Sequence, residues 1–380
     1  MKFETLAIHA GQAPEPHTGA IVVPIYQTAT YAQPAIGEHK GYEYSRTHNP
    51  TRTALEQCLA ALENGKYGMA FASGMAATST TMALFSKGDH VICGDDVYGG
   101  TYRVFEKVFR PWGLDFSFVD TTDVSQIEKA IKPTTKMIWF ETPSNPLLKV
   151  SDLRGIAALA KKHGILTAVD NTFASPYLQR PLDLGIDIVV HSTTKFLGGH
   201  SDTVGGAIIT SHEKAYERLL FSQNAIGATP GPFDSWITLR GLKTLAIRMR
   251  AHESNTMTIA QHLSKHKRVK KILYPGLPTD QYHALAKSQM SGFGALISFY
   301  LDGGEKEARM VCKSTRVFSL AESLGGVESL IEHPGLMTHA SIPKDIREAR
   351  GLGDSLIRLS VGIEHVDDLL ADIDLALASY

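Results

Sequence analysis

Short apolar segments alternate with helix-like patterns through the middle of the chain. The clearest helix is Asp152–His163, where Ser151 is a candidate N-cap, Gly164 a stop signal, and the apolar face consists of Leu153, Ile156, Ala157 and Ala160. Strands that are apolar throughout and alternate with helices are typical of a mostly parallel sheet covered on both faces. The pattern therefore predicts an α/β fold with strands at His90–Cys93, Phe116–Val119, Met137–Phe140, Leu166–Val169, Ile186–Val190 and Ala207–Thr210.

The two ends of the chain have different patterns. Residues 1–45 contain many prolines and glycines, which predicts an extended arm. After about residue 246 a long helical stretch leads to strands near Ala295–Leu301 and Ile357–Val361 and to a closing helix, Val366–Ala378. We therefore predict an arm over residues 1–45, a large domain over 46–246 and a smaller α+β domain over 247–380.

The composition narrows the class of protein. The 380 residues are 43% hydrophobic and 20% charged, which is ordinary for a globular chain and unlike a disordered or fibrous one. A formal net charge of −1 provides no field for nucleic-acid binding, and no apolar run has the length of a membrane span. The cysteines Cys58, Cys93 and Cys312 are far apart, which suits a reducing compartment. We expect a cytoplasmic protein with no nucleic-acid or membrane partner.

Polar residues follow four of the predicted strands. They are the runs Asp95–Tyr98, Glu141–Asn145, Asp170–Thr172 and His191–Lys195. In an open α/β sheet, ligands bind at the carboxyl ends of the strands. The sequence therefore predicts one polar site at this edge of the sheet.

Lys195 is the candidate nucleophile of this site. A lysine at the end of a strand is desolvated, which lowers the pKa of its amine and frees it to form a Schiff base with a carbonyl group. The hydroxyls of Ser192 and Thr194 suit a phosphate. Gly74 and Met75 begin a helix of small residues whose free N–H groups also suit an anion.

Two further residues indicate a flat ligand. Asp170 ends a strand and can pair with a protonated ring nitrogen, while Gly99 and Gly100 beside Tyr98 let a ring approach closely. Each alone also fits an ordinary structural role, a turn cap for Asp170 and a core aromatic for Tyr98. Together they describe a ring that is stacked, protonated and tethered to Lys195.

The chain resembles the Cys/Met-metabolism family of pyridoxal-phosphate enzymes, which includes cystathionine γ-synthase and cystathionine γ-lyase. The resemblance implies the aspartate-aminotransferase-like fold (fold type I), a pyridoxal 5′-phosphate cofactor and a homotetramer built from catalytic dimers. It rests on motifs spread over nearly the whole chain: Tyr44-Ser45-Arg46, Ser73-Gly74-Met75, Asp95-Asp96-x-Tyr98-Gly99-Gly100, Glu141-x-Pro143-Ser144-Asn145, Val169-Asp170-Asn171-Thr172, Ser192-x-Thr194-Lys195, Ala321-Glu322-Ser323-Leu324-Gly325-Gly326 and Ile357-Arg358-Leu359-Ser360.

The resemblance also implies a role for each matching residue. Lys195 and Tyr98 would be catalytic, Lys195 by holding the cofactor and moving protons and Tyr98 by stacking on the ring. Asp170 would bind the pyridinium nitrogen. The phosphate would be held by Gly74, Met75, Ser192 and Thr194, and from the neighbouring subunit by Tyr44 and Arg46. The substrate α-carboxylate would be held by Arg358, with help from Asn145 and Ser323.

Three residues bear on which member of the family this is. Glu43 matches γ-lyases, where some synthases have Asp. Glu322, which lyases and synthases share, can bind the distal ammonium of L-cystathionine, and Arg103 can receive a distal carboxylate of either substrate. We therefore predict a cystathionine γ-lyase, which cleaves L-cystathionine to L-cysteine, 2-oxobutanoate and ammonia. Cystathionine γ-synthase, which replaces the acyl group of O-acyl-L-homoserine by L-cysteine, stays open, as does a related sulfhydrylase or β-lyase.

Other classes of function have less support in the sequence. A binding protein that kept the fold but lost turnover would typically have lost Lys195, Asp170, Tyr98 or Arg358, and all four are present. His262 and His266 are four residues apart on a predicted helix, but no Cys/His cluster accompanies them, so we expect no metal. The basic run 265–271 is interpreted as a helix end and a solvent-exposed face.

Overall fold

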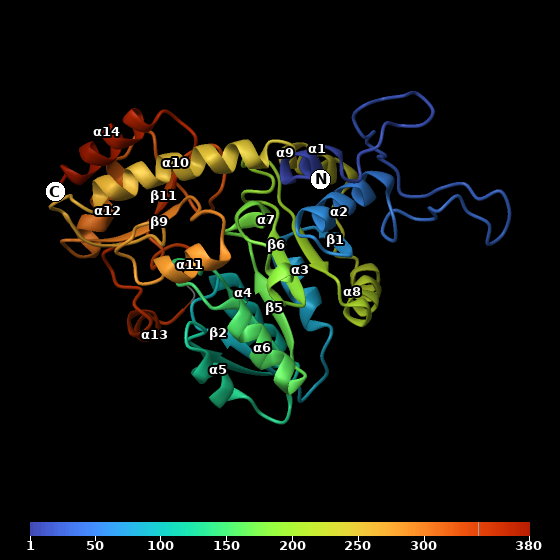
Figure 1. Cartoon of the computed structure of the whole chain (residues 1–380), viewed down its shortest axis with the longest axis horizontal. Coiled ribbons are helices and arrows are strands. Elements are labelled where there is room, and N and C mark those ends of the chain that lie inside the picture. Colours follow the sequence, from blue (N-terminus) through green and yellow to red (C-terminus); the bar gives the residue numbers. More distant parts are fainter. Residues whose placement is uncertain (341) are drawn as a thin grey trace.

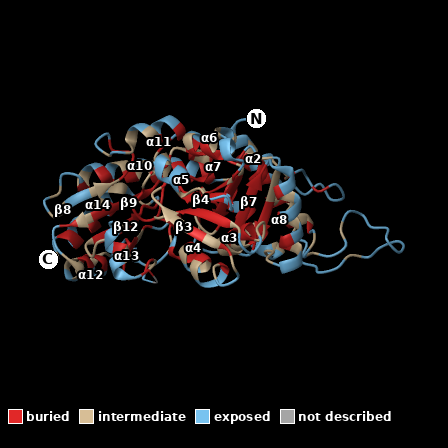
Figure 2. Cartoon of the chain, turned by 90° about the horizontal axis from the view of Figure 1, so that it is seen from below, coloured by how far each residue is buried: buried red, intermediate tan, exposed pale blue. Residues whose placement is uncertain are grey.

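The computed structural model describes residues 1–340 and 342–380. Its centre is a seven-stranded sheet, and Figure 2 shows the strands of this sheet largely buried between helices. In spatial order the strands are β1 (Tyr67–Phe71), β7 (Gly206–Thr210), β6 (Ile188–Ser192), β5 (Leu166–Asp170), β4 (Thr135–Glu141), β2 (His90–Gly94) and β3 (Asp115–Val119).

The strand directions confirm the predicted α/β sheet. Strands β3, β2, β4, β5 and β6 are parallel, and β7 runs antiparallel to both of its neighbours, β6 and the edge strand β1. All six predicted strands are present, whereas β1 was not predicted. Its Gly68 is required because a Cβ there would collide with the Glu56 carbonyl, and this glycine weakens the strand pattern in the sequence.

Helices cover both faces of the sheet. On one face Ile138 and Phe140 of β4 pack in a core with α2 (Pro50–Leu62), α6 (Leu153–His163), α9 (Pro232–Leu242) and α10 (Leu245–Leu263). On the other face Met137 and Trp139 pack with α3 (Gly74–Met82), α8 (Glu213–Ile226) and the π-helix η1 (Phe105–Phe109). The alternation along β4 explains why its sequence is apolar at successive positions. The connections also contain α4 (Gly99–Val104), α5 (Val124–Ala130), α7 (Ser175–Leu178) and η2 (Pro181–Leu184).

Helix α6 confirms the predicted stop but not the predicted start. Gly164 ends the helix with φ 65°, a left-handed conformation that suits glycine. The N-cap is Asp152, whose carboxylate accepts a hydrogen bond from the amide of Gly155 at 3.0 Å. The Ser151 hydroxyl is buried against Thr121 at 2.9 Å, so the prediction of Ser151 as the cap was wrong. On the predicted apolar face, Leu153, Ile156 and Ala160 are buried, but Leu159 is buried in place of Ala157.

The second core belongs to a five-stranded sheet in the C-terminal part of the chain. Its spatial order is β10 (Ser319–Leu320), β11 (Leu330–Glu332), β12 (Leu356–Ser360), β9 (Leu296–Leu301) and β8 (Val269–Leu273). Helices α10, α12 (Glu305–Ser314) and α14 (Val366–Leu377) pack on it, and α11 (His283–Gln289) and α13 (Lys344–Ala349) lie in the connections. The proposed limit at residue 246 falls inside α10, and the domain limits stay a prediction.

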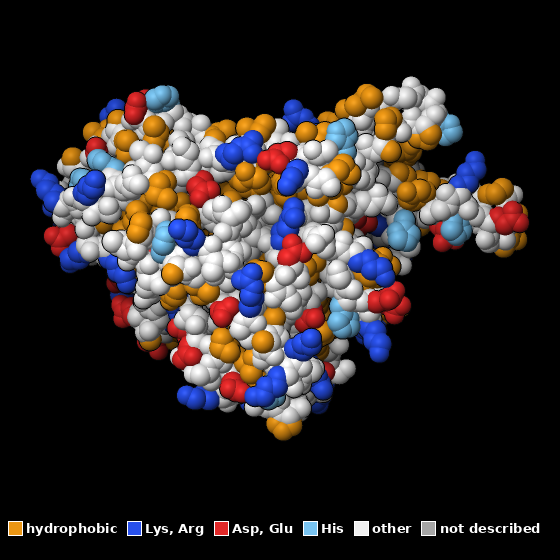
Figure 3. Space-filling model, viewed as in Figure 1, with side chains coloured by type: hydrophobic (Ala, Val, Ile, Leu, Met, Phe, Trp, Pro, Cys, Tyr) orange, Lys and Arg blue, Asp and Glu red, His pale blue; other side chains and the backbone are white. Residues whose placement is uncertain are grey.

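The basic run 265–271 differs from the expectation. Helix α10 already ends at Leu263, and the last residues of the run form the start of the edge strand β8. Lys270 and Lys271 are nevertheless exposed to solvent, as expected. On the face shown in Figure 3 both signs of charge are interspersed. Among the described residues, no helix combines the length and the apolar character needed to cross a membrane.

The N-terminal arm projects from the body of the molecule. Helix α1 (Phe3–His9) packs on α2 and α10, and the chain after it runs outwards as long loops before α2 begins (Figure 1). These loops carry the exposed apolar side chains Ile21, Val22 and Ile36. The projecting part of the arm thus lacks a hydrophobic core of its own.

Candidate active site

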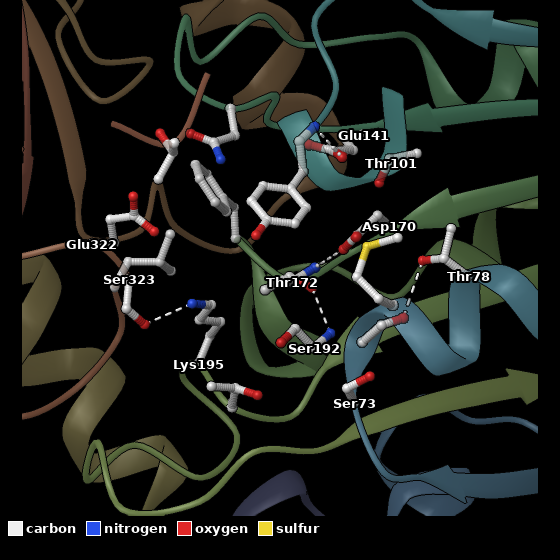
Figure 4. Close-up of a pocket in the computed structure, with 18 of the residues that line it drawn as sticks. Ser73, Thr78, Thr101, Glu141, Asp170, Thr172, Ser192, Lys195, Glu322 and Ser323 are labelled. Atoms are coloured by element: carbon white, nitrogen blue, oxygen red, sulfur yellow. Dashed lines mark hydrogen bonds between the residues drawn. The ribbon is translucent and has the colours of Figure 1, made fainter. Parts of the chain in front are cut away.

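A cavity of about 310 Å³ lies at the carboxyl ends of β5 and β6 (Figure 4). The five-stranded sheet contributes part of its wall through the segment after β10 and through Arg358 of β12. This position agrees with the edge of the sheet at which the sequence predicts a site. Of the predicted site residues, the cavity is lined by Gly74, Met75, Tyr98, Asn145, Asp170, Ser192, Thr194, Lys195, Glu322, Ser323 and Arg358.

Lys195 is held as a desolvated amine. It follows β6 by three residues, and its Nζ donates a hydrogen bond to the Ser323 hydroxyl at 2.6 Å. Burial and the nearby charge of Arg358 lower the pKa of Lys195 to about 8. Ser323 has φ 93°, a backbone conformation that is unfavourable by about 1–3 kcal/mol for a residue other than glycine. Its neighbours must therefore hold Ser323 in place.

Asp170 and Glu141 form a carboxylate pair on adjacent strands. They are directly opposite each other in the pairing of β4 and β5. Burial raises the pKa of both carboxyl groups. At Asp170 this rise is opposed by hydrogen bonds from Thr172 and by the charges of His191 and Lys195. Proximity to Asp170 pushes the pKa of Glu141 further up. We infer that Glu141 keeps its proton and that Asp170 carries the charge.

Glu141 also positions the aromatic side chain of the cavity. Its carboxyl accepts a hydrogen bond from the amide of Tyr98 at 2.7 Å, immediately before α4. The Tyr98 side chain lines the cavity and is 38% exposed. This role of Glu141 was not predicted, because Glu141 and Tyr98 are 43 residues apart in the sequence.

The opposite end of the cavity suits an anion. Helix α3 begins there at Gly74, and its N-cap Ser73 accepts a hydrogen bond from Ala76 at 3.0 Å. Gly74 packs so closely on Ser192 that a Cβ would lie 2.9 Å from the Ser192 Cβ. The Thr194 hydroxyl is fixed by the amide of Gly205 at 3.0 Å. Free amides of the first helical turn and two hydroxyls therefore face the same space.

Arg358 is a buried guanidinium that is held by three groups. Its Nη1 donates to the Asn145 side-chain oxygen at 2.8 Å, and its Nη2 donates to the Ser323 carbonyl at 2.7 Å. The Glu332 carboxylate lies 3.0 Å from Nη1, and the exposed fractions of the Arg358 and Glu332 side chains are 2% and 1%. Ser323 thus connects Arg358 with Lys195. Glu332 was not predicted as a site residue, because no sequence motif distinguishes it.

Four predicted site residues lie outside this cavity. Glu43, Tyr44 and Arg46 belong to the projecting arm, and Arg46 donates to the Asn224 carbonyl of α8 at 2.6 Å. Arg103 is exposed on α4, where its charge opposes the rise in the pKa of Tyr98 that burial causes. Within one chain these residues do not meet the others, so their roles stay predictions.

A buried polar network supports the floor of the cavity. His191 Nε2 lies 2.6 Å from a Glu63 oxygen, and Asn171 donates to the same oxygen at 2.9 Å. His191 and Asn171 adjoin Ser192 and Asp170, so this network fixes the ends of β5 and β6 from behind. Glu63 comes from the end of α2, and its distance in sequence hides the contact.

The two histidines that were expected on one helix do not share it. His262 lies in α10 and pairs with Asp374 at 2.6 Å, while His266 follows the helix. Over the described ranges, 1–340 and 342–380, no three or more His, Cys, Asp or Glu side chains gather as metal ligands would.

The donor set of the cavity fits pyridoxal 5′-phosphate. A helix N-terminus and hydroxyls suit the phosphate, the buried Asp170 carboxylate suits a protonated pyridine nitrogen, and the Lys195 amine suits the carbonyl carbon. Figure 4 shows Asp170, Ser192 and Lys195 around one open space, with Ser73 at its edge. No metal ligand is needed for any of these contacts.

The lowered pKa of Lys195 can be tested in the cofactor-free protein. Because its pKa is about 8, we expect Lys195 to reach half-maximal reactivity with an acetylating reagent near that pH. An unperturbed lysine has a pKa of about 10.4. Mass spectrometry of peptides from a pH series measures the profile, and exposed lysines in the same digest control for decay of the reagent. A Lys195 profile that coincides with those of the exposed lysines would contradict the burial argument.

Comparisons with known proteins agree with this chemistry. The family model described as Cys/Met metabolism PLP-dependent enzyme matches residues 4–378. The chain is 56% identical to a cystathionine β-lyase of Coxiella burnetii over 99% of this chain and 97% of the relative. It is 54% identical to a cystathionine γ-lyase of Bacillus subtilis over 99% of both chains.

A solved structure extends the similarity to the fold. The cystathionine γ-lyase from Lactobacillus plantarum complexed with L-serine has a TM-score of 0.98 and 52% identity, covering 100% of this chain and 99% of that one. The predicted fold of type I PLP enzymes and the predicted cofactor are thereby confirmed. The chain belongs to the Cys/Met-metabolism family of PLP-dependent enzymes.

Proposed function

We propose that the protein is a cystathionine γ-lyase, which cleaves L-cystathionine to L-cysteine, 2-oxobutanoate and ammonia. The observation that carries the proposal is the exposed carboxylate of Glu322, which lines the same cavity as Lys195 and Arg358. L-Cystathionine has an ammonium group at its far end, whereas an O-acylhomoserine has an acyl group. A carboxylate at this place therefore favours L-cystathionine as the substrate.

The site residues orient the reacting end of such a substrate. Arg358 holds the α-carboxylate with help from Asn145, because a guanidinium fork matches a carboxylate. Ser323 contacts Lys195 at 2.6 Å and Arg358 at 2.7 Å. A carboxylate on Arg358 therefore brings the neighbouring α-amine and Cα next to Lys195.

The cofactor is held by Asp170 at its nitrogen, Tyr98 at its ring, and Gly74, Met75, Ser192 and Thr194 at its phosphate. When bound, it withdraws electrons from the carbon that carries the substrate amine and makes the Cα proton acidic. Lys195 Nζ, with a pKa of about 8, is close to the operating pH and takes that proton. Cleavage at the γ-position also requires a proton from Cβ, which the same flexible amine would remove after it has passed the first proton on to the cofactor.

The related activities use the same residues. A β-lyase needs only the Cα proton, and a γ-synthase delivers a thiol to the γ-carbon in place of ammonia release. The relatives carry all three names, including a cystathionine γ-synthase of Mycobacterium bovis that is 52% identical over 98% of this chain and 96% of its own length, so product chemistry must decide.

The arm supports a further proposal about assembly. We propose that Tyr44 and Arg46 complete the phosphate site of a neighbouring copy in a homotetramer built from catalytic dimers. Tyr44 is 46% exposed, and the apolar side chains of the arm lack cover within one chain. Glu43 would then reach the neighbour's cavity together with Tyr44.

The three cysteines are free and buried, which supports a reducing, cytoplasmic compartment.

Product analysis tests the proposed reaction. We expect the cofactor-loaded protein to convert L-cystathionine alone to cysteine and 2-oxobutanoate, because Lys195 reaches the protons of both Cα and Cβ. Mass spectrometry identifies the keto acid, and a Lys195→Ala variant gives the background. Homocysteine with pyruvate would instead assign β-cleavage. The absence of any keto acid would favour the synthase, which is then assayed with an O-acylhomoserine and cysteine.

Removal of the arm guanidinium tests the assembly proposal. We expect Arg46→Ala to weaken cofactor binding about tenfold or more, because a charge-assisted hydrogen bond contributes about 1.5–3 kcal/mol. Equilibrium dialysis against pyridoxal 5′-phosphate measures the dissociation constant. Arg218→Ala, which removes an arginine that lies over the Phe221 ring on α8, is the matched control. Unchanged cofactor affinity in Arg46→Ala would show that the arm does not reach the phosphate.

A further inference from the structure

A buried acid stands directly behind Arg358. Glu332 is the last residue of β11 and is opposite Arg358 in the antiparallel pairing with β12. One carboxylate oxygen, Oε1, lies 3.0 Å from Arg358 Nη1, and the two side chains are 1% and 2% exposed. The other oxygen, Oε2, is buried and has no hydrogen-bond partner among the described residues. The ionised form of Glu332 therefore depends mainly on Arg358 for its stabilisation.

The hydrogen bonds around Glu332 form a closed ring. The Thr338 hydroxyl lies 2.9 Å from Glu332 Oε1 and also 2.9 Å from His339 Nδ1. His339 Nε2 lies 3.1 Å from the Asn145 carbonyl. The Asn145 side chain returns to Arg358 Nη1 at 2.8 Å. The ring thus joins the buried acid to Arg358, Asn145 and Thr338, which line the cavity.

The number of protons in this ring depends on Glu332. Burial lowers the pKa of His339 to about 3, so its ring is neutral and carries one proton. A carbonyl only accepts, so that proton lies on Nε2 and donates to Asn145, which leaves Nδ1 as an acceptor. The single Thr338 proton then has two acceptors, Nδ1 and Oε1. With Glu332 protonated, its O–H donates to Thr338, whose own O–H donates to His339, and every group in this sequence is paired.

The pKa of Glu332 is raised, although the positive charges near it oppose the rise. Burial raises the pKa of Glu332, the charge of Glu322 adds to the rise, and the charges of Arg358 and Lys195 oppose it. Besides Arg358 and Lys195, the titratable groups Tyr98 and Cys312 also sense the charge of Glu332. Burial raises the pKa of both, that of the Cys312 thiol to about 12. A ligand carboxylate on Arg358 adds a negative charge close to Glu332 and draws away the interaction that keeps it ionised.

We propose that Glu332 is a positioning residue that takes up one proton from solvent when a substrate carboxylate binds Arg358. The inference rests on the proposed role of Arg358 as the carboxylate clamp. In the free site the ionised Glu332 carboxylate forms an ion pair with the Arg358 guanidinium. When Glu332 is neutral, the positive charge of Arg358 is available to the ligand, and the hydrogen-bonded ring still holds the Arg358 side chain in place. Binding of a carboxylate therefore weakens as the pH rises, because binding takes up a proton and the concentration of protons in solution falls.

The test uses the cofactor-loaded protein and butanoate, a carboxylate without an amine. Its dissociation constant is followed through the visible absorbance of the bound cofactor between about pH 6 and pH 9, a range that brackets the expected uptake. In the wild type we expect the constant to rise by up to about tenfold per pH unit. Glu332→Gln resembles the neutral acid, so we expect it to bind butanoate at alkaline pH as tightly as the wild type does at acidic pH. Glu328→Gln, at a nearby exposed glutamate that contacts Ser201, should behave as the wild type.

The other results overturn the inference. A wild-type constant that does not change with pH, or a Glu332→Gln variant that keeps the wild-type slope, would show that Glu332 takes up no proton. Equal weakening at every pH in Glu332→Gln would leave it a structural role only. An Arg358→Ala variant separates the two levels: if it binds butanoate like the wild type, the clamp itself is wrong and the inference about Glu332 falls with it.

Discussion

The burial of the Lys195 amine between the two sheets is the constraint on which the site depends. An ammonium group out of water is unfavourable, and the chain holds it there with one hydrogen bond, from Nζ to the Ser323 hydroxyl at 2.6 Å. Ser323 adopts an unfavourable backbone conformation, with φ 93°, and its carbonyl is bound by Arg358. The seven-stranded sheet thus supplies the amine through the segment after β6, and the five-stranded sheet supplies, through β12 and the segment after β10, the groups that keep it desolvated and aimed into the cavity.

The same cavity balances its other charges through neighbouring strands. Asp170 and Glu141 are opposite each other on β5 and β4, and Glu332 and Arg358 are opposite each other on β11 and β12. In the first pair two acids share one proton, which leaves a single negative charge at the place that suits a pyridinium. In the second pair an acid shields a guanidinium that the substrate carboxylate needs. Strand register therefore places each of these acids directly beside the group that shifts its pKa.

Much of this arrangement can be predicted from the sequence, because buried parallel strands are apolar throughout and end in polar residues. That pattern places Asp170 and Lys195 at one edge of the sheet. Strand β1 escaped prediction because Gly68 interrupts its pattern, and the cap of α6 moved to Asp152 because Ser151 is occupied by Thr121. Glu332 and Glu63 have no local signal, since their partners are distant in sequence. The arm residues cannot be placed by one chain at all, because nothing in that chain brings them to its own cavity.

The most direct test of the account is to locate the cofactor on the chain. Borohydride reduction traps pyridoxal 5′-phosphate on the amine that holds it, and mass spectrometry of the digested protein identifies the modified peptide. The account predicts that the added mass lies on Lys195. Exposed lysines such as Lys87 should carry much less of it, even when free pyridoxal phosphate is present. Stoichiometric modification of another lysine, or none at all in the loaded protein, would contradict it.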